Sequence, residues 1–108
     1  MTAELEALLN EMKQKDIGGA VVRVDGVQVC STIPLNDVSA ALLASVSNVS
    51  DALMKRMKDE QKELEISFGD VIMVMVPINN HIFCGMIKSR EEKGVVLEYA
   101  EKAKAFLG

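Results

Sequence analysis

The sequence has no tryptophan, one tyrosine and three phenylalanines, so aromatic residues make up only 4% of its 108 residues. A hydrophobic core therefore has to be built mainly from aliphatic side chains, to which seven methionines add flexible and polarizable ones. The length suits one such core, and we expect a single domain over residues 1–108.

Cysteine and histidine are also scarce, with two cysteines and one histidine. Cys30 and Cys84 lie far apart within apolar, strand-like segments, and we expect two reduced, buried thiols. A disulfide would require the two strands to be neighbours. His81 follows the stretch PINN with no cysteine or carboxylate at ligand spacing, so we assign it to the surface or to turn packing. We therefore expect no metal and no cofactor.

Positive charge is not in excess, because the sequence has 12 Lys and Arg against 16 Asp and Glu, which gives a net charge of −4 at pH 7. No basic stripe is present that would follow nucleic-acid phosphates. The sequence also lacks an apolar run near the roughly 20 residues that cross a bilayer, and its N-terminus lacks the apolar core of a signal peptide. We expect a cytoplasmic protein that neither binds nucleic acid nor inserts into a membrane.

Catalytic motifs are missing too. The glycines match neither a phosphate-binding loop nor a dinucleotide fingerprint, and no serine stands in a nucleophile elbow. Acidic residues fall mainly on predicted helix surfaces and on alternate positions of one strand, which a solvated face explains better than a catalytic carboxylate pair. We identify no catalytic residue and expect that the protein is not an enzyme.

What is present is a regular succession of helical and strand-like patterns. Apolar residues recur at helical spacing within Thr2–Lys15 and Ser89–Leu107, and Ser89 is a suitable N-cap. Asp25-Gly26 is a two-residue turn signal that folds GAVVRVDGVQVCST into a hairpin. Three more strands are predicted at Glu63–Phe68, Val71–Val76 and His81–Lys88. The first alternates, as an edge strand does, whereas the second is apolar throughout and needs cover on both faces.

A long helix at Leu35–Gln61 completes the order helix, two strands, helix, three strands, helix. We predict an α+β fold in which a five-stranded antiparallel sheet lies between this helix and the two terminal helices, a three-layer sandwich. The long helix has more apolar surface than packing on one sheet requires. Three explanations are open for the surplus apolar row of this helix. The terminal helices cover it, it stays partly exposed, or a second molecule covers it. Serines near its centre favour the last, because they let two helices approach closely.

The predicted edge strand Glu63–Phe68 also favours a second molecule, because its unpaired backbone would accept the same strand of a copy in a two-fold contact. Glu63 and Glu65 argue against this pairing unless they are offset from each other or paired with lysines such as Lys55, Lys58 or Lys62. The predicted homodimer interface comprises Leu43, Val46, Ser47, Ser50, Met54, Met57, Leu64, Glu65, Ile66 and Ser67.

Over about residues 3–107, the sequence resembles the roadblock/dynein light chain family. The resemblance rests on GGAVVRVDGVQVCST, the Ser/Ala-rich long helix, ISFGDVIMVMVPINNHIFCGMIKS and the closing VVLEYAEKAKAFL. It implies a single roadblock-type domain with a profilin-like architecture. It also implies a dimer that forms through the long helix and the following edge strand and joins two sheets into one.

The resemblance further implies a function in protein–protein interaction. Family members bind and regulate Ras-like small GTPases or serve as adaptor subunits, and the bacterial gliding-polarity members activate GTP hydrolysis without an arginine finger. The family has no catalytic motif to transfer. We expect a docking surface for a small GTPase on the paired helices, at Ser47, Asp51, Met54 and Lys58. A structural adaptor without effect on GTP hydrolysis is the alternative, and a small-molecule sensor ranks last.

Overall fold

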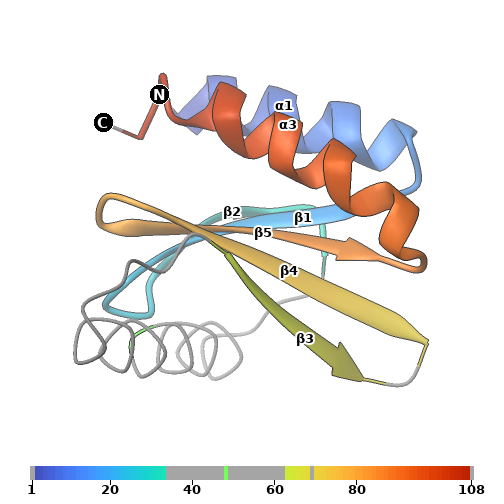
Figure 1. The fold of residues 1–108 in the computed structure, drawn as a ribbon. Coiled ribbons are helices and arrows are strands. Elements are labelled where there is room, and N and C mark those ends of the chain that lie inside the picture. The colour runs from blue at the N-terminus through green and yellow to red at the C-terminus, as the bar shows by residue number, and fades with distance from the viewer. Residues whose placement is uncertain (1, 34–47, 49–62, 69, 108) are drawn as a thin grey trace.

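The computed structural model describes residues 2–33, 48, 63–68 and 70–107. Its elements are α1 Thr2–Gln14, β1 Gly18–Arg23, β2 Gln28–Ser31, β3 Leu64–Phe68, β4 Val71–Ile78, β5 His81–Ile87, the 3-10 helix η1 Arg90–Glu92, and α3 Lys93–Ala103. The strands form one antiparallel sheet in the order β2-β1-β5-β4-β3, and α1 and α3 lie side by side over one face of it (Figure 1). The predicted α+β class with a five-stranded antiparallel sheet is confirmed. The predicted long helix lies outside the described residues except for Asn48.

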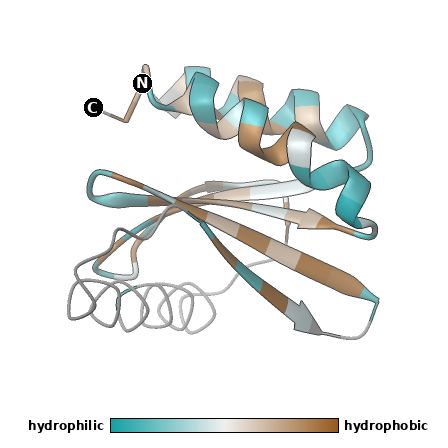
Figure 2. Ribbon diagram, in the orientation of Figure 1, coloured by the Kyte–Doolittle hydropathy of each residue, from teal (hydrophilic) through white to brown (hydrophobic). Residues whose placement is uncertain are grey.

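Both faces of the sheet are buried, as the apolar strand β4 predicted. Val74 and Phe83 belong to the cluster under α1 and α3, whereas Met73 and Met75 belong to a second cluster on the opposite face. Figure 2 shows β4 as hydrophobic along most of its length, while the outer surfaces of α1 and α3 are largely hydrophilic. Within the described residues, no helix is long and apolar enough to cross a membrane.

The two cysteines are free and buried, as predicted. Cys30 belongs to the cluster under α1 and α3, and Cys84 belongs to the cluster on the opposite face. Burial raises the pKa of the Cys30 thiol to about 11 and that of the Cys84 thiol to about 12. Both side chains therefore act as small apolar groups of the core at neutral pH.

The strand β4 is longer than predicted, because it runs on through Pro77 to Ile78 instead of ending at Val76. Pro77 adjoins the residue pair that closes a two-residue turn to β5, so its nitrogen points away from β5. On the other side, β3 begins only at Leu64, opposite Met75. The missing N–H of proline therefore interrupts no ladder hydrogen bond between the described residues, and the strand continues.

The turn between β1 and β2 lies where it was predicted but is of another type. Gly26 donates to the Arg23 carbonyl at 2.9 Å and Arg23 donates to the Val27 carbonyl at 2.8 Å, so three residues form the loop. Gly26 has a φ of 93°, which is the left-handed position of a type I turn followed by a G1 bulge. The Asp25-Gly26 pair therefore does not form the predicted two-residue turn.

The last helix begins as predicted and ends earlier. The Ser89 hydroxyl accepts from the Glu91 N–H at 3.2 Å, and the Glu92 carboxylate accepts from the Ser89 N–H at 3.2 Å, which is a capping box. The chain then turns once as η1 before α3, which ends at Ala103 and not at the predicted Leu107. This helix holds Lys93 next to β3, where the candidate site lies.

Candidate functional site

The outer edge of β3 is the one part of the predicted interface that the structure describes. β3 lies at one end of the sheet, and no described strand pairs with its outer side. Phe68 pairs with Val71 across two intervening residues, and the pair that closes such a turn is hydrogen-bonded. Because hydrogen-bonded and non-hydrogen-bonded pairs alternate, the N–H and C=O groups of Glu65 and Ser67 point away from β4. These groups are therefore directed toward a partner strand.

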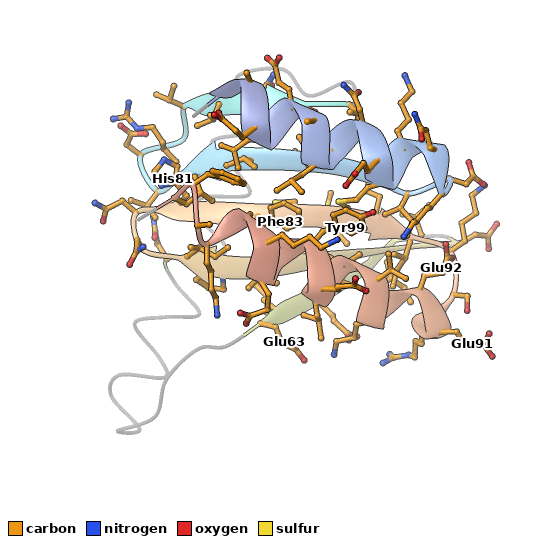
Figure 3. The ribbon with its side chains drawn as sticks, turned by 90° about the horizontal axis from the view of Figure 1, so that it is seen from above. Glu63, His81, Phe83, Glu91, Glu92 and Tyr99 are labelled. Atoms are coloured by element: carbon orange, nitrogen blue, oxygen red, sulfur yellow. The ribbon has the colours of Figure 1, made fainter. Side chains whose placement is uncertain are left out.

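Glu63 and Glu65, whose charges were expected to oppose pairing at this edge, form ion pairs with Lys93 at the start of α3. The Lys93 Nζ lies 2.7 Å from a Glu63 carboxylate oxygen and 2.6 Å from a Glu65 carboxylate oxygen. An Arg90 guanidinium nitrogen also donates to Glu65 at 3.1 Å. Figure 3 shows Glu63 at the side of the sheet next to α3. The predicted counter-charges Lys55, Lys58 and Lys62 lie outside the described residues. No pattern in the sequence indicated Lys93 or Arg90 as partners of these glutamates.

This ion cluster shifts the pKa of two of its members, Glu65 and Lys93. The hydrogen bond from Lys93, assisted by the positive charge of Lys93 and Arg90, lowers the pKa of the Glu65 carboxyl. The hydrogen bonds to Glu63 and Glu65 raise the pKa of the Lys93 ammonium. Glu65 and Lys93 are thus held in their charged forms, and Lys93 and Arg90 together place two positive charges against the two glutamates, so the edge does not present an unbalanced negative charge.

The other side of β3 is apolar. Leu64 and Ile66 are partly buried and pack against the cluster that contains Met73, Met75 and Cys84. Since successive side chains of a strand point to opposite faces, these two residues and the glutamates separate onto different sides of the sheet. The edge strand therefore combines a paired ionic row, an apolar row and open backbone groups.

The structure brings together only part of the predicted site. Leu64, Glu65, Ile66 and Ser67 lie in sequence along β3, as predicted. The remaining interface residues lie outside the described residues: Leu43, Val46, Ser47, Ser50, Met54 and Met57. The same holds for the docking residues Asp51 and Lys58. Asn48, which we placed on the solvated side of the long helix, is exposed, and its amide donates to the Val24 carbonyl at 3.0 Å.

The rest of the described surface offers little for catalysis or metal binding. Within the described residues, no group of three or more His, Cys, Asp or Glu could hold a metal ion. His81 is partly buried at the start of β5, and its Nδ1 atom has no hydrogen-bond partner among the described residues. One hollow lies between α1 and β2, and another lies between α3 and the end of β4. Neither hollow contains a cluster of titratable groups arranged for proton transfer.

Replacing Lys93 with methionine is expected to lower the melting temperature at neutral pH and to reduce its decline on acidification. The lowered pKa of Glu65 means that its pairing stabilises the folded chain above the ordinary carboxylate pKa and is lost as the pH falls through the lowered value. The raised pKa of Lys93 means that its contribution is complete below the ordinary lysine pKa and is lost as the pH rises through the raised value. Thermal unfolding of both proteins from about pH 3 to about pH 8 measures the difference.

The matched control is Lys88→Met. The Lys88 ammonium lies 3.7 Å from Asp16, and the two side chains are 74% and 89% exposed, so this pair should contribute little at any pH. The parent and Lys93→Met proteins should differ at about pH 8 and converge at about pH 3. A difference of the same size at both pH values would contradict a stabilising role for the ion pairs.

Comparison with known proteins identifies the fold. No family model and no curated protein matches the chain. A roadblock/LC7 domain from Streptomyces avermitilis superposes with a TM-score of 0.75 at 12% identity, covering 93% of this chain and 94% of the other. Myxococcus xanthus MglB gives 0.70 at 16% identity, with coverages of 96% and 84%. An MglB structure with a tetrameric arrangement gives 0.76 at 16% identity, with coverages of 97% and 85%.

The likeness extends more weakly to profilins. Acanthamoeba castellanii profilin IA superposes with a TM-score of 0.66 at 14% identity, covering 98% of this chain and 94% of the other. At such identities a superposition describes the fold, and it confirms the predicted profilin-like architecture and the resemblance to roadblock domains.

Proposed function

We propose that this chain, which has the roadblock/LC7 fold, is a non-enzymatic dimeric platform that binds and regulates a small Ras-like GTPase in the cytoplasm. The observation that carries the proposal is the edge of β3, where the backbone of Glu65 and Ser67 is open and the charges of the two glutamates are balanced by Lys93 and Arg90. An MglB with the same fold forms a tetrameric arrangement, so self-association occurs on this scaffold. The choice of a small GTPase as the partner rests on the resemblance of the sequence to the roadblock/dynein light chain family.

The regulatory step requires no catalytic residue on this chain. A platform changes the state of a GTPase only if it binds one conformation more tightly than the other, because equal affinity shifts no equilibrium. Two copies joined at β3 would bring the long helices together and assemble the docking surface at Ser47, Asp51, Met54 and Lys58. The nucleotide-dependent segments of the GTPase would then be held by contact and not by a residue inserted into its active site.

Met54→Glu is expected to dissociate the dimer, whereas Lys58→Glu should leave it intact. In an apolar contact a new carboxylate is desolvated and unpaired, which costs several kcal/mol and corresponds to a loss of at least about a hundredfold in affinity. Lys58 lies on the predicted solvated side of the helix. Light scattering on the three proteins at micromolar concentration measures the effect. A parent that is monomeric under these conditions, or a dimeric Met54→Glu variant, would contradict the predicted interface.

The regulatory proposal is tested with a small Ras-like GTPase encoded near this gene. The GTPase is loaded with GDP or with a GTP analogue and captured on the immobilised chain, and GTP hydrolysis is then measured with and without it. Preference for one nucleotide state supports regulation. Equal binding in both states, together with unchanged hydrolysis, would assign the chain to structural adaptors instead. Absence of binding in both states would remove the GTPase from the proposal.

A further inference from the structure

We propose that the hollow between α1 and β2 binds a short extended peptide segment of a partner protein, and that a basic side chain of this segment pairs with Glu6. β2 is the edge strand at the end of the sheet that lies farthest from β3. Figure 3 shows α1 and β2 along one margin of the sheet and β3 at the other. The site is therefore separate from the predicted dimer interface. It goes beyond the proposed function, because it requires neither a GTPase nor a second copy of the chain.

The hollow has the size and the polar groups of a binding site. Its volume is about 360 Å³, which is within the range of ligand-binding pockets. Side chains from one helix and one strand segment converge on it, because Glu6 and Asn10 lie one turn apart on α1, whereas Gln28, Ser31 and Thr32 line the opposite wall. A side chain that enters the hollow thus meets hydrogen-bonding groups on both walls.

Glu6 gives the hollow a negative charge. Its side chain is exposed, and its carboxylate forms no ion pair with any other described residue. Burial, together with the nearby charge of Glu6, raises the pKa of the Cys30 thiol to about 11, so this charge acts toward β2. The described residues that line the hollow include no lysine or arginine. A guanidinium or ammonium group of a partner would complete the ion pair, whereas an acidic group would be repelled.

Ser31 presents open backbone groups beside this charge. The Thr32 N–H donates to the Gly19 carbonyl of β1 at 2.9 Å, so Thr32 directs its backbone groups toward β1. Because the backbone groups of successive strand residues point to opposite sides, the N–H and C=O of Ser31 point away from β1. No described strand pairs with β2 on that side. Ser31 can therefore exchange hydrogen bonds with one residue of an extended segment.

Two features keep this open stretch of β2 short. Val29 is an extra residue in a β-bulge and has no counterpart in β1. On the other side of Ser31, the Ile33 N–H already donates to the Ser31 hydroxyl at 3.0 Å. An edge of this kind resists the addition of a whole strand. The affinity for a peptide then has to come mainly from side chains in the hollow, which makes the site selective for the sequence of the segment.

The alternation of side chains fixes where the basic residue of the segment stands. In an antiparallel segment, one residue stands opposite Ser31, and its two neighbours stand opposite Cys30 and Thr32. The Cys30 side chain lies on the face that α1 covers, so both neighbours point to that face and toward the hollow. The charge of Glu6 acts on Cys30, so the neighbour opposite Cys30 carries the basic side chain. Since the strands run antiparallel, this basic residue follows the central residue of the segment.

Fluorescence anisotropy with synthetic peptides tests the proposal. The probe is a labelled seven-residue peptide with a serine before and an arginine after a central valine, and the matched peptide has glutamine in place of arginine. The chain should bind the arginine peptide at least about tenfold more tightly, because hydrogen bonds between charged groups are the strong ones. Glu6→Gln should remove this preference. Glu11→Gln makes the same charge change on α1 outside the described lining of the hollow and should keep the preference.

Amide chemical shifts locate the bound peptide. On titration with the arginine peptide, the amides of Gln28 and Ser31 should shift, and the Ser31 N–H should exchange more slowly with solvent. The amides of Glu65 and Ser67 on the far edge of the sheet should stay unchanged. Shifts at β3 with none at β2 would place the peptide on the other edge and overturn the proposal.

The remaining outcomes are equally decisive. The proposal is wrong if the arginine peptide does not bind at millimolar concentration, or if the parent chain binds both peptides equally. Arginine amide that binds as tightly as the peptide would assign the hollow to a small cation and would overturn the peptide segment as its occupant. None of these measurements involves a GTPase or depends on dimerisation, so the proposed function stands or falls by its own tests.

Discussion

Phe83→Ala is expected to lower the free energy of unfolding by about 3–5 kcal/mol. The Phe83 side chain is 0% exposed and lies at the centre of the cluster under α1 and α3, in a sequence that has few other aromatic rings (Figure 3). Truncation removes buried apolar surface and leaves a cavity that rigid neighbours fill incompletely. Since a domain of this size is stable by about 5–15 kcal/mol, the variant should be close to unfolding at room temperature.

Urea denaturation followed by circular dichroism measures this loss. Phe106→Ala is the matched control, because Phe106 is only partly buried at the margin of the same cluster, and its loss should be clearly smaller. Equal stability losses for the two variants would show that the sheet face under α1 and α3 does not depend on Phe83 as its central side chain.

Gly85→Ala is expected to cost about 1–3 kcal/mol, although it adds a single methyl group. A Cβ atom on Gly85 would lie 2.7 Å from each of the two Val96 methyl carbons, and Val96 is fully buried. A valine in a helix has one strongly preferred rotamer, so this side chain is not free to turn away. α3 would therefore be pushed off β5, and the contacts between the helix and the sheet would weaken.

A double-mutant cycle isolates the cause. In a Val96→Ala background most of the clash is gone, so adding Gly85→Ala should cost much less than in the parent, and denaturation of the four proteins gives the coupling. Gly94→Ala is the control, because a Cβ at Gly94 meets nothing within 4 Å, and it should stabilise α3 by up to about 1 kcal/mol. Additive losses at Gly85 and Val96 would contradict the close approach as the reason for glycine.

Local sequence patterns were sufficient for much of the fold. The alternation in Leu64–Phe68 indicated an edge strand, the apolar run of β4 indicated a strand buried on both faces, and Ser89 indicated the start of the last helix. These features depend on residues near one another in the chain, where side-chain period and capping chemistry act directly. The structure confirms all three.

The differences arise where a distant segment decides the local structure. Pro77 looked like a strand end, but its nitrogen points away from β5 and no described residue of β3 stands opposite it, so β4 continues. Lys93 was not assigned to Glu63 and Glu65 because the pairing depends on where α3 crosses the sheet, which no spacing in the sequence encodes. The predicted docking surface on the long helix lies outside the described residues and remains a prediction.

The boundaries of β3 also bear on aggregation. An exposed strand edge can act as a template on which further chains add without limit, and proteins commonly blunt such edges. Here the described open stretch is the five residues Leu64–Phe68. A turn follows Phe68, and beyond Leu64 the neighbouring strand β4 contains Pro77. In a two-fold contact, the outward backbone groups of β3 in both molecules are hydrogen-bonded to each other, so no further chain can pair with this edge. In the proposed dimer, this edge would close upon a single copy of the chain and would not seed a fibre.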